Sequence, residues 1–123
     1  MTVIYWLRHA PTHEKAFVGH RDVPADLSDT AQIARLDAAL PHDALVVSSD
    51  LSRSVDTATA IQGSRTRLPD RAGLREFDFG AWDGLHFAEV AEKWPDLSRG
   101  YWENPGDIAP PQGESWSLSR IPL

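Results

Sequence analysis

The chain has 123 residues, of which 41% are hydrophobic and 24% charged, and its net charge is −6. This length allows one domain at most, and five Trp, four Phe and two Tyr exclude disorder over the whole chain, because they provide a strong drive for burial. The absence of cysteine excludes disulfides, thiolate metal sites and a cysteine nucleophile. The acidic balance argues against a nucleic-acid partner. No apolar run is long enough for a secretion signal or a membrane span, so we expect a cytoplasmic protein with no membrane partner.

The first predicted element is a β-strand at Val3–Leu7. This continuous apolar run is rich in β-branched and aromatic residues, a pattern typical of a strand buried on both faces of a parallel sheet. A loop is predicted over residues 11–28. Ser28 is the expected N-cap of the helix that follows, and Pro41 is expected to stop that helix.

A second buried strand is predicted at Ala44–Ser49, again from a short apolar run. Residues 51–62 are expected to form a helix, with Gly63 as its C-terminal cap. A weak extended stretch is predicted at Thr66–Leu68, and Leu85–Trp94 is expected to be an amphipathic helix. The order strand, helix, strand, helix indicates an α/β fold with a parallel sheet.

Polar residues of related chemistry follow both predicted strands. Arg8 and His9 come directly after the first strand, at its carboxyl end, where open α/β sheets bind ligands. A neutral imidazole is a competent nucleophile toward phosphorus, and a guanidinium group is a planar donor that fits phosphate oxygens. Arg53 lies in the first turn of the helix after the second strand, where free N–H groups also favour an anion. Taken alone, these residues fit a loop histidine and surface arginines as well as a shared phosphate site.

A carboxyl group in an apolar stretch is the third candidate. Glu76 stands among apolar and aromatic neighbours in the segment Leu74–Gly84. An apolar environment favours the protonated form of a carboxyl group, which would suit Glu76 to proton donation. A single glutamate in such a segment also fits a solvated surface residue.

In order and spacing, these segments resemble the histidine phosphatase family, also called the phosphoglycerate mutase-like family. The resemblance covers residues 3–116 and leaves a tail, residues 117–123, that is unlike the family. The matching motifs lie at Tyr5–Thr12, Gly19–Leu27, Ser48–Ala58, Leu74–Gly84 and Pro111–Ser115. The resemblance implies a three-layer α/β/α fold with a mainly parallel sheet, present here without its C-terminal part.

The resemblance also implies a two-step phosphoryl transfer. His9 attacks phosphorus and becomes a phosphohistidine, while Arg8 and Arg53 neutralise the phosphoryl oxygens. Glu76 protonates the departing alkoxide and then activates the water that hydrolyses the intermediate. Because positioning and electrostatic stabilisation dominate such transfers, no metal and no cofactor are expected.

Two further residues are expected to bind substrate by the same resemblance. Thr12 supports the phosphate or the loop through its hydroxyl group, and His20 lies at the expected mouth of the pocket. The implied partner is a small phosphorylated metabolite, whose identity the sequence does not specify.

The chain departs from the family pattern at two places. Ala10 replaces a glycine, a change that is mild at negative φ and harmful at positive φ. The family's second catalytic histidine, in a Ser-His-Gly triplet, has no counterpart after Trp116. An early stop, a frameshift or deliberate shortening would each explain its absence. His13, His20, His42 and His86 are expected to be poor substitutes for it.

Three functions fit these observations. The favoured one is a metal-independent phosphatase that hydrolyses phosphate monoesters. A phosphoglycerate mutase is the alternative within the family, but mutases carry a longer basic insertion, and here Leu85–Pro111 contains only Lys93 and Arg99 as positive charges. The third is a catalytically inactive remnant of the family with a phosphate-binding or regulatory role. We expect this chain to be a poor catalyst, and either marginally stable or ordered as a homodimer.

Overall fold

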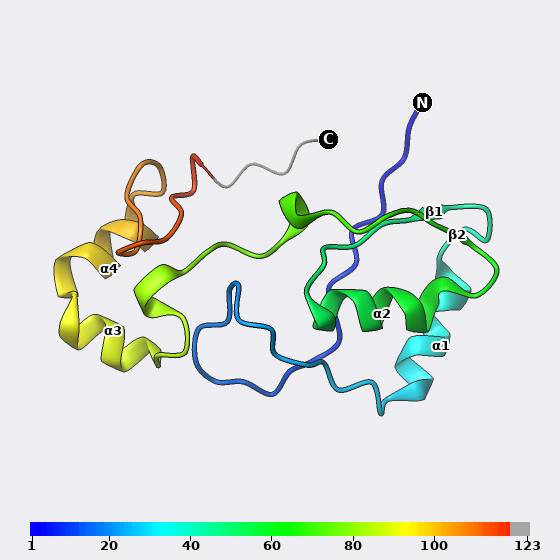
Figure 1. Cartoon of the computed structure of the whole chain (residues 1–123), viewed down its shortest axis with the longest axis horizontal. Coiled ribbons are helices and arrows are strands. Elements are labelled where there is room, and N and C mark those ends of the chain that lie inside the picture. The colour runs from blue at the N-terminus through cyan, green and yellow to red at the C-terminus, as the bar shows by residue number, and fades with distance from the viewer. Residues whose placement is uncertain (119–123) are drawn as a thin grey trace. The chain divides into compact units, whose positions relative to one another are not determined.

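The computed structural model describes residues 1–118, and Figure 1 shows the path of the chain. The chain forms two compact units, the first with residues 1–13 and 22–72, and the second with residues 14–21 and those from Gly73 onward. The first unit contains α1 (Thr30–Ala39), β1 (Leu45–Val46), α2 (Ser52–Gln62) and β2 (Thr66–Arg67). A short 3-10 helix, Ala72–Leu74, lies at the boundary in sequence, and the second unit contains a 3-10 helix at Gly80–Trp82, α3 (Phe87–Lys93) and α4 (Pro95–Glu103).

The sheet of the first unit is parallel, as the element order predicts. β1 and β2 pair with Leu45 opposite Thr66 and Val46 opposite Arg67. The N–H of Leu68 extends this pairing by donating to the carbonyl of Val46 at 2.8 Å. Because α2 lies between the two strands in sequence, the predicted succession of strand, helix and parallel strand is confirmed for this part of the chain.

The predicted strand at Val3–Leu7 is not formed. Four of its side chains, those of residues 3–6, are 51–66% exposed, and within residues 1–118 the segment belongs to no strand. A strand exists only through hydrogen bonds to a neighbouring strand, and burial on both faces requires a covering layer on each side. The described residues supply neither to this segment, so its predicted burial is also wrong. The second predicted strand is likewise not buried throughout, because Leu45 and Val47 are 63% and 40% exposed.

Both helices of the first unit lie where the sequence predicts them, with one different cap. Asp29, not Ser28, is the N-cap of α1, and its Oδ1 accepts a hydrogen bond from the N–H of Gln32 at 3.0 Å. Ser28 is held in the preceding turn, because its own N–H donates to Asp26 at 2.9 Å, so the helix begins later. α2 ends as predicted at Gly63, whose φ of 53° is unfavourable for residues with a side chain.

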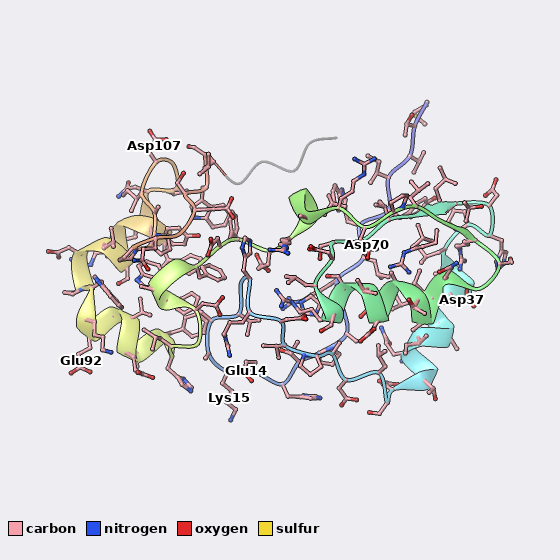
Figure 2. All side chains as sticks on the ribbon, viewed as in Figure 1. Glu14, Lys15, Asp37, Asp70, Glu92 and Asp107 are labelled. Atoms are coloured by element: carbon pink, nitrogen blue, oxygen red, sulfur yellow. The ribbon has the colours of Figure 1, made fainter. Side chains whose placement is uncertain are left out.

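A buried arginine joins the C-terminal ends of α1 and α2. The side chain of Arg65 is 2% exposed and donates five hydrogen bonds of 2.6–2.9 Å. One acceptor is the carboxylate of Asp37, labelled on α1 in Figure 2. The other four are the main-chain carbonyls of Asp37, Leu40, Pro41 and Ile61. Carbonyls at the end of a helix have no partner within the helix, so Arg65 satisfies acceptors that the fold places around it.

The second unit is built around aromatic side chains. Its buried core consists of Phe17, Phe79, Trp82, Val90 and Tyr101. Trp82 and Tyr101 are 0% exposed, and their rings meet edge to face with 5.3 Å between centroids. α3 and α4 pack against each other and contribute Val90 and Tyr101, so the helix pair closes one side of this core.

The sequence analysis does not predict α4. It predicts one helix over residues 85–94, which the structure forms as the shorter α3. Pro95 ends that helix but is also the first residue of α4, a position where the missing N–H and fixed φ of proline are compatible with a helix. The apolar face predicted for this helix is only partly buried: Val90 is 1% exposed, whereas Phe87 is 59% exposed.

Gln112, in the Pro111–Ser115 motif, has a left-handed backbone with a φ of 63°. This conformation costs a residue with a Cβ about 1–2 kcal/mol, and the larger freedom of glycine in the unfolded chain offsets part of any gain. We therefore expect Gln112→Gly to raise the free energy of unfolding by about 0.5–1 kcal/mol. Gln112→Ala keeps the strain and should give no gain. Urea denaturation followed by tryptophan fluorescence measures both, and equal stability of the two variants would contradict the strain argument.

The predicted tail, residues 117–123, is described only at Ser117 and Leu118, because residues 119–123 lie outside the described residues. The boundary between domain and tail therefore stays a prediction. No helix within residues 1–118 is long and apolar enough to cross a membrane.

Candidate active site

One ring nitrogen of the half-buried His9 has a defined partner. Nδ1 lies 2.7 Å from the carbonyl oxygen of Ala10. A carbonyl oxygen only accepts hydrogen bonds, so Nδ1 carries a proton and donates it. In the neutral ring Nε2 then holds the free lone pair. An imidazole in this tautomer has its Nε2 lone pair available to act as a nucleophile.

The residue after His9 is tied to α2 by one hydroxyl group. The N–H of Ala10 donates to Thr57 Oγ1 at 2.9 Å, and the same hydroxyl donates to the carbonyl of Arg53 at 2.7 Å. Thr57 is buried on α2 and belongs to the Ser48–Ala58 motif, but the sequence analysis assigns it no role. Its hydroxyl links the backbone beside the candidate nucleophile to the helical turn that carries Arg53.

The replacement of glycine by Ala10 proves mild. Among residues 1–118, the only residues other than glycine with positive φ are His13 and Gln112. Ala10 therefore has a backbone conformation that any residue adopts, and its Cβ introduces no backbone strain.

Arg53 is almost fully buried, at 1% exposed, which is rare for arginine. It lies within electrostatic reach of Asp22, whose Oδ1 accepts a hydrogen bond from the N–H of Ser52 at 2.7 Å at the start of α2. Hydrogen bonds from the side chain and backbone of Ser52, assisted by the charge of Arg53, lower the pKa of Asp22. A buried guanidinium group and a helix N-terminus thus lie together, an arrangement that favours an anion.

The other two candidates of the first unit are less defined. Arg8 is exposed and Thr12 is half-buried, and both belong to the unit that contains His9 and Arg53. The hydrogen bonds through Thr57 connect the N–H of Ala10, next to His9, with the carbonyl of Arg53. The convergence of Arg8 and Arg53 on one phosphate stays a prediction.

Glu76 belongs to the second unit and is exposed, so its predicted apolar environment is wrong. Its Oε1 accepts a hydrogen bond from the N–H of Phe77 at 3.0 Å. Its neighbour Phe77 packs against the aromatic core and Phe79 belongs to that core, whereas the side chain of Glu76 is not buried with them.

His20 lies between two carboxylates of the second unit. Its Nδ1 is 3.7 Å from Asp78 and its Nε2 is 3.7 Å from Glu114. Glu114 also accepts a hydrogen bond from the N–H of Asp78 at 2.9 Å. These contacts hold His20 against two of the motif segments, while its role in substrate binding stays a prediction.

His13 pairs with a carboxylate of the same unit. Its Nε2 lies 2.8 Å from Asp26. Hydrogen bonds from the side chain of Ser28 and then from His13 lower the pKa of Asp26 from 3.8 to about 2.

This lowered pKa predicts an acid-sensitive contribution to stability. The folded state favours the charged form of Asp26, so its contribution is present above pH 3.8 and is lost as the pH falls toward about 2. We expect Asp26→Asn to flatten the pH dependence of the unfolding free energy in this interval. Urea denaturation at several pH values measures it, with Asp43→Asn as the control in an exposed turn. The same pH slope in both variants would contradict the prediction.

The six predicted site residues thus lie in two units. Arg8, His9, Thr12 and Arg53 belong to the first, and His20 and Glu76 to the second. A cleft shared by all six stays a prediction. Within residues 1–118, no group of three or more His, Asp or Glu side chains is arranged to hold a metal ion.

Comparison with protein families decides the assignment. The model of the histidine phosphatase superfamily (branch 1) matches residues 4–119. The chain belongs to this superfamily. It is 36% identical over 118 residues to the glucosyl-3-phosphoglycerate phosphatase of Mycolicibacterium vanbaalenii, which is 89% of this chain and 51% of that relative. It is 29% identical over 124 residues to the 2,3-bisphosphoglycerate-dependent phosphoglycerate mutase of Xanthobacter autotrophicus, which is 92% of this chain and 60% of that relative.

A solved structure supports the fold. The mycobacterial glucosyl-3-phosphoglycerate phosphatase Rv2419c, in complex with inorganic phosphate, is similar with a TM-score of 0.73 and 27% sequence identity, covering 90% of this chain and 54% of that chain. The predicted α/β fold of the phosphoglycerate mutase-like type is therefore confirmed. This histidine phosphatase chain spans 51–60% of the length of these three proteins.

Proposed function

We propose that this histidine phosphatase chain binds small phosphate monoesters and hydrolyses them through a phosphohistidine at His9. The observation that carries the proposal is the hydrogen bond from His9 Nδ1 to the carbonyl of Ala10 at 2.7 Å, because it leaves Nε2 as the nucleophilic atom. The residues concerned lie within the stretch that matches the family, and the similar protein of M. vanbaalenii is named a phosphatase.

The reaction would take two steps. Nε2 of His9 forms a bond to phosphorus, the bond between phosphorus and the ester oxygen breaks, and Glu76 gives a proton to the leaving alkoxide. Water then attacks the phosphohistidine, one of its protons passes to Glu76, and inorganic phosphate leaves as the bond to Nε2 breaks. Arg8 and Arg53 neutralise the phosphoryl oxygens in both steps. In this proposal they supply the positive charge that metal ions supply in other phosphoryl-transfer enzymes.

Two residues complete the substrate contacts in this proposal. Thr12 donates its hydroxyl to a phosphate oxygen or to the loop, and His20 contacts the remainder of the metabolite. We also propose that the protein works in the cytoplasm on a small phosphorylated metabolite rather than on nucleic acid or a membrane. Formation of a homodimer would cover the exposed apolar segment Val3–Leu7.

A phosphoglycerate mutase is the second candidate, and the similar mutase of X. autotrophicus supports it. In a mutase the phosphohistidine passes its phosphoryl group to the hydroxyl of a second phosphoglycerate instead of to water. Residues 85–111 provide only Lys93 and Arg99 as cations for such an acceptor. This shortage favours the phosphatase.

A single-turnover assay with an aryl phosphate labelled at phosphorus tests the proposal, even when turnover is slow. We expect acid-labile label on the protein, followed by free inorganic phosphate. Added phosphoglycerate should not take up the label, and transfer of the label to it would favour the mutase. Absence of labelled protein contradicts the proposal, and binding of inorganic phosphate without labelling would support an inactive phosphate-binding remnant.

The link through Thr57 makes a separate prediction. Thr57→Val keeps the side-chain shape but leaves the N–H of Ala10 and the carbonyl of Arg53 without this partner, so we expect a loss of about 1–2 kcal/mol in stability and about tenfold in labelling rate. Thr57→Ser keeps the hydroxyl and should restore most of both. Urea denaturation and rapid-quench labelling measure them. A Val variant with the labelling rate of the parent chain would show that this hydroxyl does not position His9.

A further inference from the structure

Tyr101 carries a polar group that no part of the described chain satisfies. The residue is 0% exposed on α4, and within residues 1–118 its hydroxyl has no hydrogen-bond partner. The neighbouring ring of Trp82, 5.3 Å away between centroids, offers only a π-face or an indole N–H that itself has no partner among these residues. Buried polar groups are nearly always paired, so a hydroxyl in this place points to an acceptor that it meets in the working protein.

Ring contacts place Tyr101 next to the segment that carries Glu76. The ring of Tyr101 lies 6.0 Å from that of Trp116, and Trp116 meets Phe77 edge to face at 4.6 Å. Phe77 follows Glu76 directly. Glu114, two residues before Trp116, accepts a hydrogen bond from the N–H of Asp78 at 2.9 Å. Glu76 and Glu114 thus flank in sequence the two rings, Phe77 and Trp116, that connect to Tyr101.

The charges nearby agree with this placement. The pKa of Tyr101 is raised, mainly by burial and further by the negative charges of Glu76 and Glu114. Glu114 is already engaged by the N–H of Asp78, and it lies 3.7 Å from His20. Within residues 1–118 Glu76 accepts a hydrogen bond only from the N–H of Phe77, so of these two carboxylates it has the greater capacity to accept another.

We propose that Tyr101 is a positioning residue for Glu76, to which its buried hydroxyl donates a hydrogen bond directly or through one water molecule. The inference rests on the proposed function, in which Glu76 gives and takes the proton. An exposed glutamate samples several rotamers, and a donor fixed in a rigid core selects one of them. Tyr101 would thereby hold the carboxyl group in one orientation for proton transfer without touching the substrate.

The first test measures the interaction between Tyr101 and Glu76 and does not require the protein to be catalytically active. The chain has two tyrosines, so in a Tyr5→Phe background the ultraviolet absorbance of tyrosinate reports on Tyr101 alone. Glu76→Gln removes a negative charge and should move the ionisation of Tyr101 to lower pH. Glu92→Gln, on the exposed face of α3 (Figure 2), is the matched control and should leave it unchanged. If Tyr101 ionises at the same pH in the Glu76→Gln protein as in the protein that retains Glu76, the proposal is overturned.

The second test separates positioning from simple packing. Tyr101→Phe keeps the ring in the core, and we expect it to lower kcat about tenfold with little change in KM. In the Glu76→Gln background the same change should have no further effect, because the group that Tyr101 positions is gone. Equal losses in both backgrounds, or no loss in the parent background, would show that the hydroxyl does not act through Glu76. If the parent chain neither labels nor releases phosphate, the proposed function fails, and the tyrosine titration alone decides whether Tyr101 and Glu76 interact.

Discussion

Replacing His9 with alanine should abolish the acid-labile phosphoenzyme and reduce phosphate release by roughly 10⁴-fold or more, the scale seen when a nucleophile is deleted. The structure gives the reason at the level of one atom. Nδ1 is committed to the carbonyl of Ala10 at 2.7 Å, so Nε2 is the free nitrogen of the ring. Alanine offers no atom in its place, and the bound phosphate would face Arg8 and Arg53 with nothing to attack it.

The matched control for this variant is His42→Ala, which removes an exposed imidazole from the same unit. It should be labelled as fast as the parent chain. Rapid quench in acid and in base distinguishes a phosphohistidine, which is acid-labile, from a phosphoester. Persistent acid-labile label in the His9→Ala protein would show that the nucleophile is another residue.

The candidate residues of the first unit are named from sequence by the family resemblance. His9 and Arg53 each follow a short apolar segment and carry groups suited to phosphate, but taken alone they fit a loop histidine and a surface arginine equally well. The hydroxyl of Thr57, which joins the N–H of Ala10 beside His9 to the carbonyl of Arg53, has no comparable signal in the sequence. It acts across 47 positions of the chain, and its residue type suits many buried helix positions equally well.

Two errors of the sequence analysis have local causes. Phe77 and Phe79 lie in or against the aromatic core, but Glu76 itself is exposed, so apolar neighbours in sequence do not by themselves bury a carboxyl group. Pro95 predicts the end of one helix, but proline is equally suited to the first position of the next helix, which is where the structure places it.

The missing strand at Val3–Leu7 has a non-local cause. Its composition reports a tendency to be buried, but burial depends on which other segments cover it. Within residues 1–118 four of its side chains remain more than half exposed. A pattern within five residues cannot show which segments will cover it. The parallel pair β1 and β2, connected through α2, forms without the Val3–Leu7 segment.

Arg65 is the residue whose loss should cost the first unit most in stability. We expect Arg65→Ala to lower the free energy of unfolding by on the order of 3 kcal/mol, because the side chain is 2% exposed and four main-chain carbonyls lose a donor together with the carboxylate of Asp37.

Arg65→Lys should recover little of this loss. An ammonium group carries its three donors on one nitrogen, so it cannot reach acceptors at the ends of two helices as a planar guanidinium does. Arg35→Ala is the matched control: that side chain is exposed on α1 and donates to Gln32 at 2.6 Å, so its removal should change stability by less than about 0.5 kcal/mol. Urea denaturation followed by circular dichroism gives the free energies, and amide exchange at the last turns of α1 and α2 shows whether those ends open. A lysine variant as stable as the parent chain would mean that charge, rather than the five directed hydrogen bonds, is what holds the two helix ends together.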